Sequence, residues 1–153
     1  MDKYSDLEFS ALVEISKLAN LLQYVMDLGM EEITSKQWLP LMLLGQFTEA
    51  PTLNQLAEKC GITRQSTKQL VDKLNERELI EIRKDENDKR SMRISITEKG
   101  MNWGEHNFER NSKFVKDLFG EVSEEELMTF YLVQNKLMKK LIEIKDDFTK
   151  ETV

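Results

Sequence analysis

The stretch Leu53–Leu74, LNQLAEKCGITRQSTKQLVDKL, decides the fold of this chain. Thr52 precedes it and Gln55 follows three residues later, a capping-box pattern that predicts the start of a helix. This short helix is expected to end at Gly61, and Thr63 is expected to cap a second helix. Two helices joined by a tight turn through glycine are typical of a helix-turn-helix.

The outward residues at the start of the second helix are rich in hydrogen-bond donors. Side chains of this kind can bind base edges in the major groove of DNA. We therefore expect this face to contact DNA, and the alternative is an ordinary solvated helix face. The residues are Arg64, Gln65, Lys68 and Gln69.

The spacing of apolar residues changes after the second helix. Ile80 and Ile82 alternate with charged residues, and Met92, Ile94 and Ile96 do the same, which predicts two strands. The polar stretch between them, KDENDKRS, predicts a hairpin with a long charged tip.

Such a hairpin, beside a DNA-contacting helix, can reach the DNA backbone or the minor groove, where basic side chains are favoured. The basic residues of the tip are Lys84, Lys89 and Arg90. We expect Asp88 to orient a neighbouring arginine, and Asp85 and Glu86 to face away from the phosphates. A plain solvated loop is the alternative.

Helical spacing of apolar residues predicts further helices on both sides. They are expected at 6–28, 35–45 and 98–119, and a capping box of Ser123 and Glu126 predicts a last helix to about residue 148. The expected fold is mainly α with a small β-hairpin, a winged helix-turn-helix with N- and C-terminal dimerisation helices.

The last helix carries apolar residues at three-four spacing, as in a coiled-coil seam. We expect this seam to pack against a partner helix in a homodimer, and the alternative is a core-facing stripe within one chain. The seam comprises Leu127, Phe130, Gln134, Leu137, Leu141 and Ile144, followed by Phe148.

The expected organisation has three parts that form one intertwined domain in the dimer. Residues 1–30 are an N-terminal dimerisation helix, 31–100 a winged helix-turn-helix DNA-binding domain, and 101–153 the C-terminal dimerisation helices.

Composition excludes several protein classes. The 153 residues include one cysteine and one histidine, too few for an internal disulfide or a structural zinc site, so we expect no metal and no cofactor. No apolar run is long enough for a membrane span and no secretory signal is visible, which predicts a cytoplasmic protein. Motifs of phosphate loops, nucleophile elbows and metal hydrolases are absent, so an enzyme is not expected.

The net charge of −6 is unevenly distributed. Residues 61–100 contain ten Lys or Arg against eight Asp or Glu, which gives +2 and leaves −8 for the rest of the chain. A mildly basic middle between acidic flanks is compatible with a module that binds a polyanion, although this excess is small.

The stretch DKRSMRISITEKG, residues 88–100, resembles the wing and second strand of the multiple antibiotic resistance regulator (MarR) family of winged helix-turn-helix repressors. Residues 53–74 are similar to that family's helix-turn-helix, and the resemblance covers nearly the whole chain. Two departures stand out: the family usually has glycine where Glu78 stands and an aliphatic residue where Thr67 stands.

This resemblance implies a transcriptional regulator, a repressor, that binds a pseudo-palindromic operator as a homodimer. It implies that Arg90 enters the minor groove. It also implies that one set of residues faces the major groove: Thr63, Arg64, Gln65, Ser66, Lys68 and Gln69.

Members of the family are commonly released from DNA by a small aromatic ligand or by cysteine oxidation. An apolar pocket for such a ligand could be lined by Tyr24, Trp38, Met42, Trp103 and His106, and the alternative is that these residues are plain core. A thiol-based redox sensor that uses Cys60 is another alternative. A third is a winged-helix module that binds a protein partner through its acidic surface.

Overall fold

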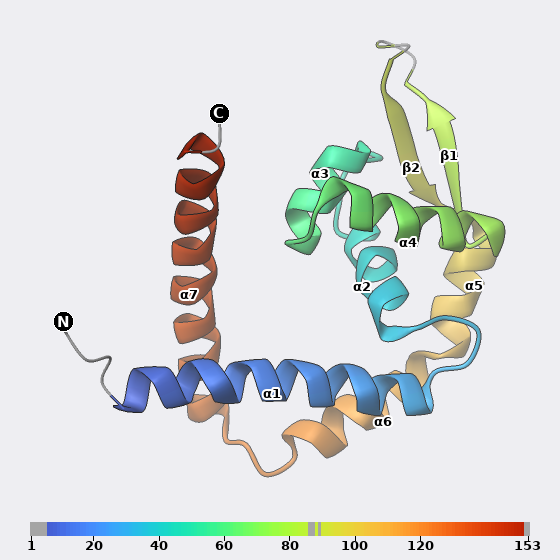
Figure 1. The fold of residues 1–153 in the computed structure, drawn as a ribbon. Helices are drawn as coiled ribbons and strands as arrows, with labels where there is room; N and C mark the ends of the chain where they lie inside the picture. Colours follow the sequence, from blue (N-terminus) through green and yellow to red (C-terminus); the bar gives the residue numbers. More distant parts are fainter. Residues whose placement is uncertain (1–5, 86–87, 89, 152–153) are drawn as a thin grey trace. The chain divides into compact units, whose positions relative to one another are not determined.

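The computed structural model describes residues 6–85, 88 and 90–151, and Figure 1 shows the path of the chain. The elements in chain order are α1 (Asp6–Gly29), α2 (Ser35–Leu44), α3 (Leu53–Cys60), α4 (Arg64–Glu76), β1 (Ile80–Lys84), β2 (Met92–Ile96), α5 (Glu98–His106), α6 (Phe108–Phe119) and α7 (Glu124–Glu151). The chain divides into two compact units, residues 1–106 and 107–153.

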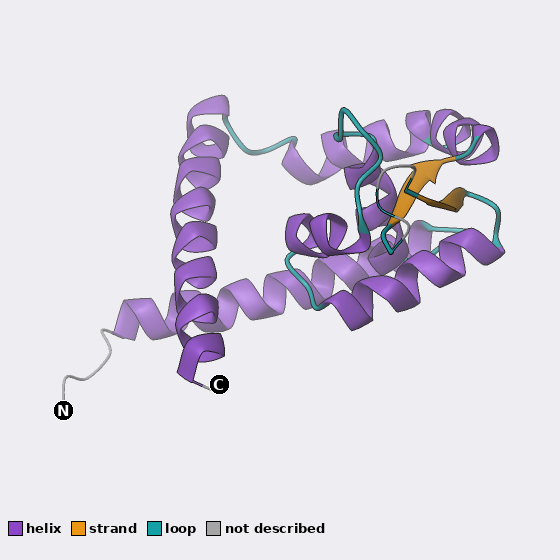
Figure 2. Cartoon of the chain, turned by 90° about the horizontal axis from the view of Figure 1, so that it is seen from above, coloured by secondary structure: helices purple, strands orange, loops and turns teal. Residues whose placement is uncertain are grey.

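The first unit is built around the helix-turn-helix. Helices α2, α3 and α4 pack against one another, and the β1–β2 hairpin continues from α4 and projects beyond the helices (Figure 1). In Figure 2 the two strands of the hairpin are orange, and the purple helices make up most of the rest of the unit. The core combines side chains from the helices and both strands: Ile33, Leu41, Leu44, Leu56, Val71, Leu74, Leu79, Ile80, Ile94 and Trp103.

Helix starts in this unit are set by threonine caps. The backbone N–H of Gln55 donates to Thr52 Oγ1 (3.3 Å), and the backbone N–H of Thr52 donates to Gln55 Oε1 (2.8 Å), so the predicted capping box is confirmed. Thr34 and Gln37 form a second capping box at α2, which was not predicted from the sequence. These caps satisfy backbone N–H groups that a helix leaves unpaired in its first turn.

The two strands form an antiparallel pair, as the alternating apolar residues predicted. The register places Ile80 opposite Ile96 and Ile82 opposite Ile94. Ile80 and Ile94 are fully buried, so the hairpin is attached to the helices by its base. This attachment matters because an isolated two-stranded hairpin is only marginally stable in water.

The single helix predicted for 98–119 is wrong in one respect, because the structure has two helices there. Helix α5 ends at His106 and α6 begins at Phe108, with Asn107 between them. The buried Asn107 side chain accepts a hydrogen bond from the Arg110 guanidinium (2.6 Å). Asparagine favours helix ends because its side chain competes for local hydrogen bonds. The helical spacing of apolar residues continues across this break, and the sequence pattern therefore missed it.

The second unit contains α6 and α7. The predicted capping box at the start of α7 is confirmed, since Glu126 N–H donates to Ser123 Oγ (3.2 Å) and Ser123 N–H donates to Glu126 Oε2 (2.9 Å). Hydrogen bonds from Ser123 lower the pKa of the Glu126 carboxyl. Every side chain of α7 described by the structure is exposed in the single chain. Among the described residues, no helix is long and apolar enough to cross a membrane.

Candidate nucleic-acid interface

The turn between α3 and α4 has the backbone conformation that a helix-turn-helix requires. Gly61 has φ 69°, in the left-handed region, and its N–H bonds to the carbonyls that end α3. Ile62 N–H also donates to Ala57 O (3.3 Å). Glycine adopts this conformation without the steric cost of a Cβ atom, so the turn fixes where α4 begins.

The inner face of α4 is packed into the core, which determines the face it presents outward. Val71 and Leu74 are buried, as predicted, and Leu70 is half-buried. Thr67 is fully buried, and its hydroxyl donates to Thr63 O (3.0 Å), so the polar group that replaces the family's aliphatic residue is satisfied within the helix.

The predicted contact residues all lie on the opposite face of α4 or at its start. Each is exposed: Thr63, Arg64, Gln65, Ser66, Lys68 and Gln69. Two hydroxyls of this set serve the helix cap, since Thr63 Oγ1 accepts from Ser66 N–H (3.1 Å) and donates to Ser66 Oγ (2.9 Å). Lys68 Nζ forms an exposed ion pair with Asp72 (2.5 Å). Among the described residues, the side chains of this set that take part in no ion pair or hydrogen bond are Arg64, Gln65 and Gln69.

The tip of the hairpin is organised by Asp88. Its carboxylate accepts the backbone N–H of Arg90 (3.0 Å) and the hydroxyl of Ser91 (2.8 Å). These bonds, the one from Ser91 first, lower the pKa of the Asp88 carboxyl. The exposed side chains of Lys84 and Arg90 form no ion pair with a described carboxylate. Lys89 and Glu86 lie outside the described residues.

One sequence prediction about the acidic residues of the hairpin needs correction. Asp88 was expected to orient a neighbouring arginine, and its carboxylate accepts the backbone N–H of Arg90. Asp85 was expected to face away, but it is buried and forms an ion pair with the guanidinium of Arg93. The strand register explains this, because it places Arg83 directly opposite Arg93, and like charges at such positions repel unless each has a counter-ion. Glu81 pairs with Arg83 (2.8 Å), and Asp85 pairs with Arg93.

The Arg93 region also connects the hairpin to the helix-turn-helix. Arg93 Nη1 donates to Ala50 O (3.0 Å), and the backbone N–H of Ile94 donates to Pro51 O (3.0 Å). An isolated bridge pairs Thr52 with Arg93. The segment that leads into α3 therefore lies along β2. The sequence pattern did not predict this contact, because Arg93 and Ala50 lie 43 positions apart in the chain.

The residues proposed from sequence as a ligand pocket fall into two groups. Trp38 and Met42 are half-buried and pack against the core, and Trp103 is buried in it. Tyr24 and His106 are exposed. The buried indole N–H of Trp38 and the buried hydroxyl of Ser35 on the same helix have no hydrogen-bond partner among the residues that the structure describes. Such groups are rare in folded proteins because an unpaired buried donor is energetically costly.

Cys60, the last residue of α3, is half-buried. Burial raises the pKa of its thiol above the ordinary value of 9.0. A raised pKa disfavours the thiolate, which is the reactive form. Within the described ranges, no group of three or more His, Cys, Asp or Glu side chains is placed to hold a metal ion.

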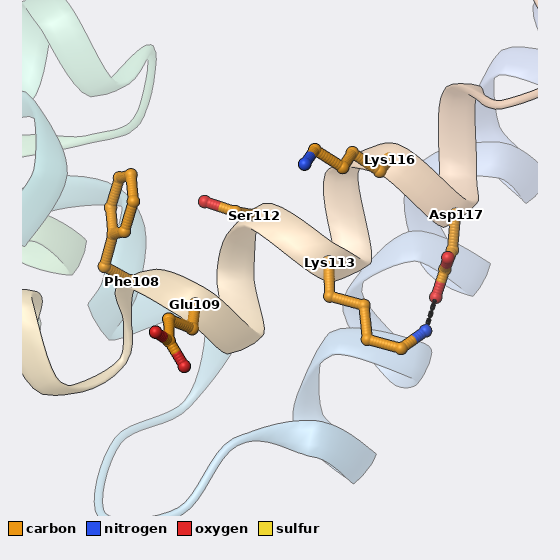
Figure 3. Close-up of a pocket in the computed structure, with 6 residues that line it drawn as sticks. All are labelled: Phe108, Glu109, Ser112, Lys113, Lys116 and Asp117. Carbon is orange, nitrogen blue, oxygen red and sulfur yellow. Dashed lines mark hydrogen bonds and ion pairs between the residues drawn. The ribbon is translucent and has the colours of Figure 1, made fainter.

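A depression open to solvent lies along α6 in the second unit (Figure 3). Its lining residues all come from this helix: Phe108, Glu109, Ser112, Lys113, Lys116 and Asp117. Lys113 and Asp117 form an ion pair, drawn as a dashed line in Figure 3. None of the residues predicted for the ligand pocket lines this depression.

The seam predicted on α7 is exposed in the single chain. Its apolar members are all exposed, and so are the apolar residues of α1 except Met26, which is half-buried. Packing of this seam against a partner helix stays a prediction, and so does its alternative, a core-facing stripe within one chain. Exposed apolar surface of this extent is typical of an interface.

Comparison with known proteins shows what the chain is similar to. Residues 32–91 match the model of the MarR family. A MarR/EmrR family transcriptional regulator from Acinetobacter sp. ADP1 has TM-score 0.80 and 23% identity, with 90% of this chain and 99% of that chain covered. No curated protein sequence matches the chain.

Two further solved structures share the fold. The S. aureus MepR–DNA complex has TM-score 0.74 and 22% identity, with 92% of this chain and 99% of that chain covered. Bordetella bronchiseptica BpsR, whose DNA binding is regulated by 6-hydroxynicotinic acid, has TM-score 0.69 and 16% identity, with 86% and 98% covered. At these identities the likeness establishes the fold, the winged helix-turn-helix with long terminal helices that the sequence predicted.

Proposed function

We propose that this chain is a DNA-binding transcriptional regulator rather than an enzyme. Two findings support the proposal: residues 32–91 match the model of the MarR family, and the chain shares the fold of a solved MarR/EmrR family regulator. In this proposal it binds a pseudo-palindromic operator as a homodimer, represses transcription, and is released by a small ligand. MepR, which shares the fold, was solved bound to DNA.

The observation that carries DNA binding is the outward face of α4 together with the adjacent hairpin. The start of α4 carries three exposed side chains that can donate hydrogen bonds, and the opposite face of the helix packs into the core. The three are Arg64, Gln65 and Gln69. Bidentate contacts from arginine to guanine and from glutamine to adenine are the commonest means of reading bases in the major groove. Arg90 at the hairpin tip is an exposed guanidinium suited to the narrow minor groove.

Ion pairs within residues 61–100 engage part of the acidic residues around this face and leave several described basic side chains unpaired. Four of the seven described acidic residues in this range pair with basic side chains of the same range: Asp72 with Lys68, Glu78 with Lys99, Glu81 with Arg83 and Asp85 with Arg93. Their carboxylates are therefore partly neutralised, whereas Arg64, Lys84 and Arg90 remain available for phosphates or bases.

The homodimer is supported by the exposed apolar side chains of α1 and α7. The three-four spacing on α7 suits a second copy of the same helix, with Gln134 as the single polar position of the seam. Two α4 helices in such a dimer bind half-sites about 10 base pairs apart, centre to centre. Sedimentation of the purified protein tests the dimer, and only monomer at micromolar concentration would contradict it.

The test of DNA binding is selection from a randomised duplex pool, repeated with Arg90→Ala and at two salt concentrations. We expect enrichment of a palindrome with half-sites about one helical turn apart, weakened by Arg90→Ala. Higher salt should weaken binding steeply, because phosphate contacts release counterions. A folded dimer that enriches no sequence at low salt would contradict the proposal and favour a protein-interaction module.

The ligand part of the proposal rests on Trp38 and Ser35 of α2, whose buried N–H and hydroxyl have no hydrogen-bond partner in the described part of the chain. A small aromatic acid that accepts hydrogen bonds there would satisfy both groups, with half-buried Met42 as apolar contact. BpsR, which has the same fold, is regulated by an acid of this class.

Titration with 6-hydroxynicotinic acid and with benzoic acid tests this site, with the unfolding temperature and operator affinity as readouts. We expect a ligand to raise the unfolding temperature and to weaken operator binding in the wild type. Trp38→Phe keeps the aromatic ring but removes the N–H, and should lose the response. Tyr24→Phe is the control, since Tyr24 is exposed. Equal responses of wild type and Trp38→Phe would contradict a ligand site at Trp38.

A further inference from the structure

We propose that Asp85 is the positioning residue that fixes the hairpin to the start of α3, and that it thereby sets affinity for the DNA that flanks each half-site. The inference rests on the proposed function for its DNA consequence, whereas the structural link itself is independent of DNA.

Each of the two oxygens of the Asp85 carboxylate accepts a hydrogen bond, and the two donors belong to different parts of the hairpin. Oδ2 accepts the Nε–H of Arg93 on the neighbouring strand, and Oδ1 accepts the backbone N–H of Asp88 in the tip (2.9 Å). The backbone N–H of Asp85 donates to Ser91 O on the returning side of the hairpin (2.9 Å). One residue therefore holds Asp88, Ser91 and Arg93 together.

Arg93 carries this connection to the helix-turn-helix. Its Nη1 donates to Ala50 O, two residues before Thr52, and Thr52 caps α3. The backbone N–H of Ile94 donates to Pro51 O, so a second hydrogen bond joins β2 to the same segment. A continuous chain of hydrogen bonds thus leads from Asp88, through Asp85 and Arg93, to Ala50 in the segment that leads into α3.

Burial makes this link strong as well as continuous. The Asp85 side chain is 6% exposed and that of Arg93 36% exposed, whereas the Arg83–Glu81 pair beside it is 74% and 36% exposed. Removing one member of a buried pair leaves a charge without a partner and is costly, but exposed pairs contribute little. Among the described residues, Asp85 is the charged side chain that joins Asp88 to Arg93 and, through Arg93, to the segment that leads into α3.

The position of the tip decides what Arg90 can reach. Arg90 follows Asp88 by two residues, and its backbone N–H is held by the Asp88 carboxylate. A hairpin that is free to swing loses affinity, because ordering it on DNA costs conformational entropy. The loss should fall on the minor groove flanking each half-site and not on the bases that α4 contacts.

The experiment compares wild type, Asp85→Asn and Glu81→Gln on two duplexes. The long duplex carries the selected operator with its flanks, and the trimmed duplex ends at the outer edge of the half-sites. We expect Asp85→Asn to weaken binding to the long duplex by on the order of tenfold and to leave the trimmed duplex within about threefold of wild type. Glu81→Gln breaks the exposed pair of the same hairpin and should change neither duplex by more than about threefold.

Amide hydrogen exchange supplies a readout that needs no DNA. Asp85→Asn should speed exchange at the amides of Asp88 and Ile94, at the two ends of the link, and leave α4 unchanged. If wild type binds neither duplex while exchange changes as stated, the proposed function fails and the link stands.

Two results would overturn the proposal. One is equal loss of affinity on both duplexes together with faster exchange throughout the first unit, which indicates general destabilisation. The other is unchanged affinity and unchanged exchange. If Asp85→Asn does not fold, the double variant Asp85→Asn/Arg93→Gln replaces the ion pair with two amides, leaves no buried charge unpaired, and undergoes the same comparison.

Discussion

Gly100 lies directly against the carbonyl oxygen of Leu79, so closely that a Cβ atom on Gly100 would come within 2.1 Å of that oxygen. Thr97 strengthens the same junction, since its N–H donates to Leu79 O (3.1 Å) and its hydroxyl donates to Glu78 O (2.6 Å). Gly100 N–H in turn donates to Thr97 Oγ1 (3.0 Å). The start of α5 is thereby joined to the turn between α4 and β1, which sets the base of the hairpin.

Gly100→Ala should strongly destabilise the protein. The added Cβ meets a backbone carbonyl, which cannot rotate away, as well as Ile96 Cγ2 at 2.8 Å. Overpacking of this kind costs about 1–3 kcal/mol and occasionally more, and we expect a loss of about 3 kcal/mol in the free energy of unfolding. Chemical denaturation followed by circular dichroism measures it.

Gly104→Ala is the matched control in the same helix. A Cβ at Gly104 meets nothing within 4 Å, so alanine should raise the free energy of unfolding by up to about 1 kcal/mol through its higher helix propensity. Similar effects of the two substitutions would show that Gly100 is not in the close contact described.

Glu78 occupies a backbone conformation that suits glycine better. Its φ is 61°, which places it in the left-handed region that disfavours residues with a Cβ atom. The departure from the family's usual glycine therefore leaves the turn geometry intact at an energetic cost. Glu78→Gly should unfold with a free energy about 1 kcal/mol higher than that of Glu78→Ala.

The comparison with alanine is needed because both substitutions remove the exposed Lys99–Glu78 pair (3.0 Å). The difference between them therefore isolates backbone conformation. Equal stability of the glycine and alanine variants, measured by denaturant unfolding, would argue against strain at Glu78.

Helix starts could be predicted from the sequence because a cap involves residues three apart. Thr52, Thr63 and Ser123 each cap the helix that local sequence assigned to them. The outward face of α4 could also be predicted from local sequence, because the apolar residues Val71 and Leu74 mark the opposite face, which packs into the core.

Contacts that depend on strand register or on tertiary position could not be predicted in this way. The Asp85–Arg93 pair follows from the register that sets Arg83 opposite Arg93, and the long charged tip left that register open. Arg93 reaches Ala50, 43 positions earlier in the chain, which no local pattern encodes. The end of α5 before Asn107 could not be predicted, because apolar residues keep their helical spacing on both sides of Asn107.

Asp72→Asn should tighten binding to DNA of any sequence. Asp72 pairs with Lys68 on the outward side of α4 and partly neutralises it, so its removal frees a cation for a phosphate. We expect a gain of about two- to fivefold in affinity at low salt and a salt slope steeper by up to about one counterion. Fluorescence anisotropy at several salt concentrations measures both.

Asp117→Asn provides the control for Asp72, because it breaks a pair of the same i,i+4 spacing with Lys113 on α6. That variant should leave affinity and salt slope unchanged. A gain of equal size in both variants would point to net charge and not to Lys68.

Cys60 should react slowly with a thiol reagent at neutral pH. Burial raises the pKa of its thiol, so at pH 7 the thiolate fraction is below that of a free cysteine, and the rate should rise with pH to a midpoint above that of the denatured chain. Reaction with an aromatic disulfide, followed by absorbance, gives the profile, and the denatured chain is the reference. A native rate at pH 7 that exceeds the denatured rate would restore the redox-sensor alternative.

Gln65 and Lys84 should have different effects on DNA binding because they lie on different parts of the interface. Gln65 is exposed on the first turn of α4, where a bidentate amide can read a base, so Gln65→Ala should cost about 1–3 kcal/mol on the best site and relax base preference at one position. Lys84 ends β1 and is exposed beside the tip, so Lys84→Ala should weaken all sequences alike and reduce the salt slope by about one. Competition assays with the selected operator and single-base variants of it separate the two effects. Unchanged preference in Gln65→Ala would mean that another face of α4 enters the groove, while a change of preference in Lys84→Ala would place the hairpin at the bases.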